Sequence, residues 1–450
     1  MTQGRPANKM LSALCLKPLT RFSFSLLVLF AACCLLNACD SAPVEGNAAL
    51  RDIRGEESSA PNRFFGDIKS SEVFATVERD NYLSLPSDHE SHPDFQLEWW
   101  YLTFVLTSDT GEELGLQYTL FRFNTDSRGD QQHAKSHWAN TQQWMGHASL
   151  HTKNRHYFEE RFAAGNVGNA YVKRQPFTAV VDDWQWKSTA TNNSKEAASE
   201  SNGMFPSSLL FTFGNEKKNA KSSVVAMNAA LPTATSPSSQ YTLDNNAVSV
   251  SLNLSATGPF IKHGDNGYSK KTEDGRLRSY YYSQPFIQAN GTVNIEGKTL
   301  KVSGKGWFDH EWTSHLANSQ AMGWDWFSLH LDDGSKLMAF RMHASTGRSK
   351  NEKNEVYTTA SYITTEGIKE TIDQASISIT PVKYETIKSG ETNRTVPTAW
   401  QIRIPKKNIN ATVAAFKKNQ WNDSLFPYYE GRVKISGSHL GSGFMELTGY

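Results

Sequence analysis

Short runs of aromatic and β-branched residues, separated by Gly, Asp and Asn, recur from Phe74 to the end of the sequence. One pair of runs, residues 96–106 and 114–123, flanks turn residues at 109–111 and predicts a long β-hairpin. Residues 322–331 and 336–342 repeat this build around the turn residues at 332–334. Because helical periodicity is scarce throughout, we predict an all-β fold.

The likeness between the two hairpins predicts two related domains. Trp99 holds the position in the first hairpin that Trp324 holds in the second. We therefore expect one β domain over residues 73–262 and another over residues 263–450. Antiparallel strands need their edges hidden, which closure into a barrel achieves, and a barrel of about eight strands can hold one small ligand.

Residues 188–240 interrupt the strand pattern. They are dominated by Ser, Asn, Ala, Thr and Lys, and only Met204 to Phe213 resembles a strand. We interpret this stretch as a low-complexity surface insertion in the first domain, without catalytic residues.

Charge and composition exclude several classes of protein. The 46 Lys and Arg residues nearly balance 45 Asp and Glu, so nothing electrostatic favours a nucleic-acid partner. The 24 Phe, 16 Tyr and 12 Trp residues exclude a disordered chain, and an apolar content of 38% excludes a polytopic membrane protein.

The first 38 residues are expected to be a signal peptide. A basic start precedes an apolar run from Phe22 to Leu36, which is short for a membrane span. Residues 36–39 resemble a bacterial lipobox, so we expect Cys39 to be lipidated and to become the new N-terminus, with residues 39–72 as a flexible tether. Asp40 resembles the signal that retains lipoproteins in the inner membrane, so we expect the protein on the periplasmic side of that membrane.

All four cysteines, Cys15, Cys33, Cys34 and Cys39, lie in or beside this leader. The body of the protein is therefore expected to contain no disulfide, thiol nucleophile or thiolate metal site.

The densest candidate site combines two acids and an imidazole with three aromatic residues: Trp307, Phe308, Asp309, His310, Glu311 and Trp312. On a regular strand, His310 faces one side while Asp309 and Glu311 face the other. Burial against rings would raise the pKa of an acid, and nearby carboxylates would raise that of His310, which makes a general acid plausible. The alternative is a polar strand end whose acids bind backbone amides.

Two further clusters could bind a ligand. Glu98 precedes Trp99, Trp100 and Tyr101, although these could equally be core aromatics with Glu98 paired to an Arg. The phenols of Tyr281 and Tyr282 could donate to a ligand or lie at a wet barrel rim.

Metal and hydrolase motifs are incomplete. His315 follows His310 and Glu311 at a spacing that misses the zinc-binding H-E-x-x-H pattern, and no G-x-S-x-G elbow occurs. We therefore expect no metal site and no α/β-hydrolase mechanism.

Several motifs together resemble the AttH-like group, which belongs to the carotenoid 1,2-hydratase and kievitone hydratase superfamily. They are Glu98 to Tyr101, His263 to Ser269, Tyr281 to Ser283, Gly306 to Trp312, Tyr429 to Gly431 and Glu446 to Tyr450. The resemblance implies two tandem lipocalin-like, calycin-type antiparallel β-barrels. In some members it implies hydration of an isolated carbon–carbon double bond without a cofactor.

The same resemblance suggests roles for individual residues. A His and a Trp two positions later are implicated in the hydratases, and they correspond to His310 and Trp312. A further Tyr and Asp of the hydratases could correspond to the neighbourhood of Trp324, Asp325 and Trp326.

Our leading functional hypothesis is a periplasmic hydratase or hydrolase for a hydrophobic unsaturated small molecule, such as an isoprenoid or a lipid. His310, with Asp309 or Glu311, would supply a proton, and a pocket lined by Trp99, Trp100, Trp307 and Trp312 would stabilise the resulting carbocation. The alternative is a non-catalytic lipoprotein that binds a hydrophobic ligand and works with a membrane ABC-type transporter.

Overall fold

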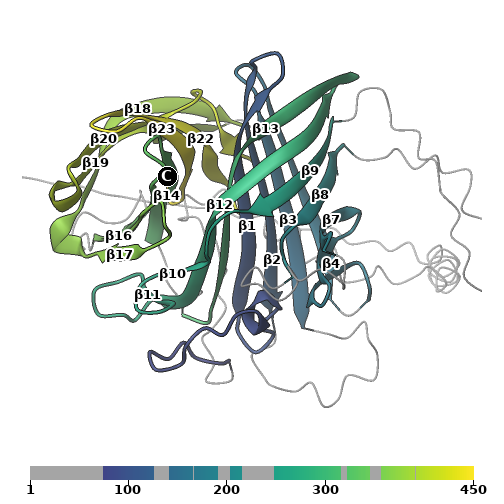
Figure 1. Ribbon diagram of the computed structural model, residues 1–450, viewed down its shortest axis with the longest axis horizontal. Coiled ribbons are helices and arrows are strands. Elements are labelled where there is room, and N and C mark those ends of the chain that lie inside the picture. Colours follow the sequence, from purple (N-terminus) through teal and green to yellow (C-terminus); the bar gives the residue numbers. More distant parts are fainter. Residues whose placement is uncertain are drawn as a thin grey trace, which may run out of the picture. The chain divides into compact units, whose positions relative to one another are not determined.

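The computed structural model describes residues 74–125, 141–165, 167–190, 203–214, 248–315, 322–344, 356–390 and 392–450. Their strands form two antiparallel sheets within one compact unit, residues 60–450, and this confirms the all-β prediction (Figure 1). In this part of the chain no helix is long and apolar enough to cross a membrane. The predicted signal peptide, Cys39 and the tether lie outside the described residues.

The first sheet contains thirteen strands. Eleven follow one another across the sheet in the order β4 (His156–Ala164), β3 (Gln142–His151), β2 (Glu113–Asn124), β1 (Leu97–Ser108), β13 (Lys298–Thr313), β12 (Arg278–Ile295), β9 (Val248–Ala256), β8 (Ser207–Phe213), β7 (Trp184–Ser188), β6 (Phe177–Val181) and β5 (Ala170–Arg174). The short strands β10 (Ile261–Lys262) and β11 (Tyr268–Lys270) pair with β12.

The second sheet contains ten strands and is seen end-on in Figure 1 as an almost closed ring, coloured green to yellow. Its order is β17 (Lys369–Ile372), β16 (Tyr357–Ile363), β15 (Lys336–Ala344), β14 (Met322–Leu331), β23 (Gly441–Leu447), β22 (Tyr428–Gly437), β20 (Ile409–Ala415), β19 (Thr392–Ile404) and β18 (Ser378–Ser389), with β21 (Trp421–Asn422) paired to β22. Single-turn helices occur at Ser87–His89, Gln374–Ser376 and Pro405–Lys407.

The two predicted hairpins are confirmed as β1–β2 and β14–β15. Strand β1 is largely apolar between Trp99 and Leu106 and is buried on both faces. One face lines the core of the first sheet, while the other packs against the second sheet. A near-continuous apolar run is the pattern expected of a strand covered on both sides.

The change from one sheet to the other lies between Thr313 and Met322. It does not coincide with the predicted domain boundary after residue 262, because the long hairpin β12–β13 pairs with both β1 and β9 of the first sheet. Local patterning reveals that β12 and β13 are strands, but it does not reveal these distant partners.

The predicted insertion at residues 188–240 contains β8, which pairs between β7 and β9. Leu209 and Phe211 of this strand are buried in the core. The strand-like part of the insertion is therefore part of the hydrophobic core and not a surface loop. Residues 191–202 and 215–240 lie outside the described part of the chain.

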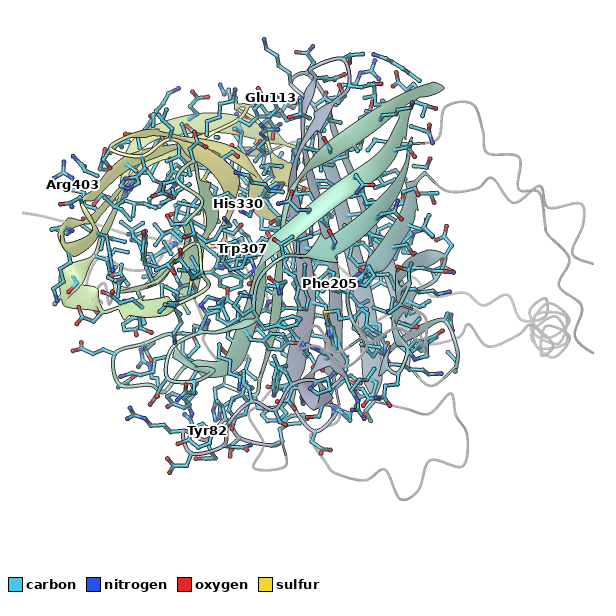
Figure 2. All side chains as sticks on the ribbon, in the orientation of Figure 1. Tyr82, Glu113, Phe205, Trp307, His330 and Arg403 are labelled. Atoms are coloured by element: carbon cyan, nitrogen blue, oxygen red, sulfur yellow. The ribbon has the colours of Figure 1, made fainter. Side chains whose placement is uncertain are left out.

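Buried side chains form a core within each sheet and a third cluster between the sheets. Trp307 of the first sheet packs edge-on against His330 of the second, with ring centroids 5.8 Å apart, and both are labelled where the sheets meet in Figure 2. Arg432 of β22 also donates to the carbonyl oxygens of Leu106 and Leu114, each at 2.9 Å. The sheets are thus joined by both apolar and polar contacts.

Candidate active site

Strand β13 presents two different chemical surfaces to its two sides. Its pairing with β1 aligns Asp309 with Tyr101 and Glu311 with Trp99 on one face. The intervening pair, His310 with Trp100, lies on the other face because strand side chains alternate. The predicted separation of His310 from the two acids is confirmed, and each face carries its own polar cluster.

A pocket opens on the face that carries Asp309 and Glu311, between the two sheets. Aromatic and apolar side chains from β1, β2, β14 and β15 form most of its wall. The lining residues are Trp99, Tyr101, Thr119, Phe121, Lys271, Asp309, Glu311, Trp324, Trp326, Phe340, Met342 and Glu446. Both sheets are needed to form it.

Asp309 is held in the pocket wall by two neutral hydrogen-bond donors. Its carboxylate accepts hydrogen bonds from the indole Nε1 of Trp307 at 2.8 Å and from the hydroxyl of Ser283. Burial nevertheless raises the pKa of Asp309 to about 7, because these donors only partly compensate for the lost water. The expectation that burial would raise the pKa of an acid here is confirmed, and a fraction of Asp309 carries a proton at neutral pH.

A second acid reaches the pocket from the other sheet. Glu446 of β23 accepts a hydrogen bond from the indole Nε1 of Trp324 at 2.7 Å, and burial raises its pKa to about 7. Behind it, burial raises the pKa of Glu430 well above its usual range, and the hydroxyl of Tyr101 donates to this carboxyl group. The pocket therefore contains exchangeable carboxyl protons on both sides.

His310 lies in a separate buried cluster on the opposite face of β13. Its Nε2 atom is 2.9 Å from Oε1 of Glu98, and its Nδ1 atom is 2.9 Å from the hydroxyl of Tyr282. Glu98 also binds Nδ1 of His92 at 2.6 Å and Nε of Arg122 at 2.8 Å. The alternative in which Glu98 pairs with an Arg is therefore the arrangement that forms.

The charges of this cluster are largely balanced internally. Burial lowers the pKa of His310 to about 4 despite Glu98, so the expected rise is wrong and the imidazole is neutral at pH 7. Burial opposes protonation of His92 too, but the carboxylates of Glu98 and Asp88 outweigh it and raise the pKa of His92 to about 9. Glu98 is thus paired with two cations, His92 and Arg122.

His92, Glu98 and His310 form the one group in the described ranges with metal-ligand spacing, since their donor atoms lie within 4.8 Å of one another. Each ligand atom already has a hydrogen-bonding partner, and Arg122 is in direct contact with Glu98. A divalent cation would add to the positive charge of Arg122, so the geometry favours a hydrogen-bonded cluster over a metal centre.

The remaining predicted site residues divide between these two faces. Trp100 and Trp312 stack against the imidazoles of His310 and His92, outside the pocket lining, with centroids 4.6 and 3.8 Å apart. Tyr281 accepts a hydrogen bond from Trp326 at 3.2 Å and so lies directly behind the pocket wall.

Asp325 points away from the pocket, although Trp324 and Trp326 on either side of it both line it. Its carboxylate pairs with Arg341 at 2.6 Å and accepts a hydrogen bond from the hydroxyl of Tyr450 at 2.8 Å. Strand alternation separates the side chain of Asp325 from those of its neighbours.

Sequence reasoning missed Lys271, Phe121, Phe340 and the role of Glu446 in this pocket. Lys271 follows β11 in an ordinary polar stretch, and nothing in its neighbourhood indicates burial. Glu446 offered a signal, because it is a lone acid in an apolar strand in the same way as Glu98.

Comparison with known proteins agrees with this architecture. The model of the family described as AttH-like matches residues 76–219 and 212–450. The chain belongs to the AttH-like family. The crystal structure of an AttH candidate from Nitrosomonas europaea is similar to this AttH-like chain, with 26% identity, a TM-score of 0.63 and coverage of 84% of this chain and 99% of that one.

Two further relatives of the AttH-like chain have names that state an activity. Kievitone hydratase from Nectria haematococca shares the fold at 15% identity and a TM-score of 0.54, over 84% of this chain and 96% of that one. The dehydratase asqC of Emericella nidulans is 23% identical over 176 residues, which is 37% of this chain. The match spans 48% of asqC, about half its length.

Proposed function

We propose that the chain is a hydratase, which adds water to or removes it from a carbon–carbon double bond of a hydrophobic small molecule bound in the pocket between the sheets. The observation that carries this proposal is the pair of carboxyl groups, Asp309 and Glu446, that face an aromatic pocket with pKa values raised to about 7. The names of kievitone hydratase and dehydratase asqC agree with water addition and removal as the reaction class.

The chemistry requires one acid and one base. One carboxyl group donates its proton to an alkene carbon, and the other, ionised, takes a proton from the water whose oxygen bonds to the neighbouring carbon. The net change is addition of one water molecule, and the reverse sequence is dehydration. Two acids that titrate near neutrality can fill both roles, and we expect a bell-shaped dependence of rate on pH with its maximum near pH 7.

The aromatic wall has a complementary role. Trp99, Trp324, Trp326 and Phe340 pack against an apolar ligand and keep bulk water from a reactive intermediate. His310 and Trp312 lie on the opposite face of β13, outside the lining of this pocket. The catalytic roles predicted for them therefore have no part in this proposal and stay predictions.

The experiment that tests the function starts from the native ligand. The protein is purified from its own membrane, and small molecules that accompany it are identified by mass spectrometry. Each is then incubated with the protein in water enriched in oxygen-18. Incorporation of labelled oxygen supports a hydratase, whereas tight binding without incorporation supports the ligand-binding alternative.

We also propose that the hydratase acts at the periplasmic side of the inner membrane, held there by a lipid on Cys39. Support comes from the lipobox-like residues 36–39 and from Asp40. A membrane location suits a substrate that partitions into lipid. A membrane ABC-type transporter remains the partner proposed for the non-catalytic alternative.

A further inference from the structure

A buried lysine in the pocket has no role in the acid–base pair. Lys271, 4% exposed, lies in the segment between β11 and β12 and lines the pocket. Its Nζ atom is 2.7 Å from Oε1 of Glu311 and lies 4.8 Å from the ring centroids of both Tyr281 and Phe340. A lysine is rarely buried to this degree without a specific function or partner.

The charge of Lys271 is already balanced. Glu311 provides one negative charge at contact distance, while burial favours the neutral, protonated forms of Asp309, Glu446 and Glu430. A ligand carboxylate would add a second, uncompensated negative charge, which is costly in a buried site. The ligand group that fits beside Lys271 is therefore uncharged.

The ammonium group still has hydrogen-bonding capacity. It carries three N–H donors, and Glu311 is the one acceptor that the described residues give it. A neutral acceptor on the ligand, such as a carbonyl oxygen, can accept one of the others.

The N–H donors of Lys271 also constrain the intermediate. Protonation of an isolated alkene leaves a carbocation, which an N–H donor cannot stabilise. If the alkene is conjugated to a carbonyl group, the charge that develops is negative and lies on the carbonyl oxygen, where an ammonium donor stabilises it.

We propose that the substrate is an uncharged α,β-unsaturated carbonyl compound whose carbonyl oxygen binds to Lys271 beside Glu311. This inference rests on the proposed hydratase function and names its substrate class. The water oxygen bonds to the β-carbon while one carboxylate takes the water proton. The π electrons move onto the carbonyl oxygen to give an enolate, and the other carboxyl group then protonates the α-carbon, so the carbonyl re-forms and one water has been added.

The test uses three small aromatic probes and measures binding. Benzylideneacetone is a conjugated ketone, benzylacetone is its saturated ketone analogue, and propenylbenzene has the alkene without the carbonyl group. Dissociation constants come from quenching of tryptophan fluorescence, since Trp99, Trp324 and Trp326 line the pocket. The carbonyl stretching frequency of each bound ketone is recorded by difference infrared spectroscopy.

We expect wild-type protein to bind both ketones roughly tenfold more tightly than propenylbenzene, as one hydrogen bond from a charged donor provides. In wild type the hydrogen bond from Lys271 should also lower the carbonyl stretching frequency of each bound ketone. Lys271→Met should reduce the binding preference to about twofold and abolish this frequency shift, while Lys271→Arg should retain both. Lys336→Met is the matched control, because Lys336 is also buried, lies over the ring of Phe286 and is outside the pocket. It should leave the preference unchanged.

The double variant Lys271→Met with Glu311→Gln removes both charges together and replaces the single variant if that one does not fold. An equal preference for ketones in wild type and in the folded Lys271 variant would overturn the proposal, as would the absence of any preference in wild type. These outcomes are separate from the oxygen-18 experiment. If wild type prefers ketones and Lys271→Met loses that preference, but no labelled product forms in oxygen-18 water, the hydratase is refuted while the carbonyl site stands.

Discussion

At the scale of the residue, Asp309 is held in a site that disfavours its ionised form. Its carboxylate is buried beside Trp307 and Ser283, and its pKa of about 7 lies above the usual value for an aspartate. The two hydrogen bonds fix the carboxyl group, while the aromatic surroundings keep it protonated for longer as the pH rises.

This shift makes stability depend on pH in a defined direction. Because the folded pKa is raised above the unfolded value of about 4, the folded state binds the proton more tightly, and Asp309 destabilises the fold as the pH rises from about 4 to about 7. Asp309→Asn removes this dependence. We expect the stability of the variant relative to wild type to be at least about 1 kcal/mol greater at pH 8 than at pH 5, with the free energy of unfolding measured in urea at both values. A gain of equal size at both values would contradict the assigned shift.

At the scale of the element, β13 separates a reactive face from a structural face. The sequence alone predicted the strand and its alternation, because Asp309, His310 and Glu311 are consecutive residues in an apolar run. It could not predict that both faces are buried, since this depends on β1 and on the second sheet, far away in the chain. The partner of His310 was missed for the same reason: Glu98 lies 212 residues earlier.

Glu98 is expected to stabilise the structural face of this strand pair. Glu98→Ala leaves the buried Arg122 and the partly buried His92 without their shared counter-ion, and breaking a buried ion pair costs about 3–5 kcal/mol. Equilibrium unfolding in urea measures this loss. Asp94→Ala, at an exposed position nearby, is the control and should change stability by less than about 0.5 kcal/mol. A similar small change for Glu98→Ala would show that the cluster contributes little.

At the scale of the whole molecule, the pocket exists only where two sheets meet. Hairpin likeness predicted two similar β units, but the residues that join them are spread over the chain and share no local pattern. Arg432, for example, contacts the carbonyl oxygens of Leu106 and Leu114, more than 300 positions earlier. Long-range partners of this kind are determined by packing, and this explains why Lys271 and Phe340 of the pocket were not found from sequence.

The shared interface predicts that the two sheets unfold together. Differential scanning calorimetry of the protein should show one transition, because the cluster between the sheets buries side chains from both. Arg432→Ala removes the buried guanidinium and should shift that transition by an amount equivalent to about 2–4 kcal/mol without splitting it. Two separate transitions in wild-type protein would show that the sheets are independent.

We propose above that a lipid on Cys39 attaches the whole protein to the membrane, and this proposal predicts the behaviour of a Cys39 variant. Cys39→Ser should abolish labelling by a radioactive or clickable fatty acid and release the protein from the membrane fraction. Replacement of Cys34 by Ser is the control and should leave labelling intact, since Cys34 does not follow the lipobox-like residues. Labelling that persists in Cys39→Ser would exclude this anchor.

The proposal that water is added in the pocket between the sheets, with Asp309 as one of its two acids, is tested most directly by comparing Asp309→Asn with His310→Ala. Both folded variants are given the native ligand in oxygen-18 water, and the rate of label incorporation is measured beside ligand affinity. We predict that Asp309→Asn loses at least about 100-fold in rate while its affinity stays within roughly threefold, and that His310→Ala keeps its rate within roughly tenfold. Full activity of Asp309→Asn together with an inactive His310→Ala would contradict this account and assign the proton donor to the opposite face of β13.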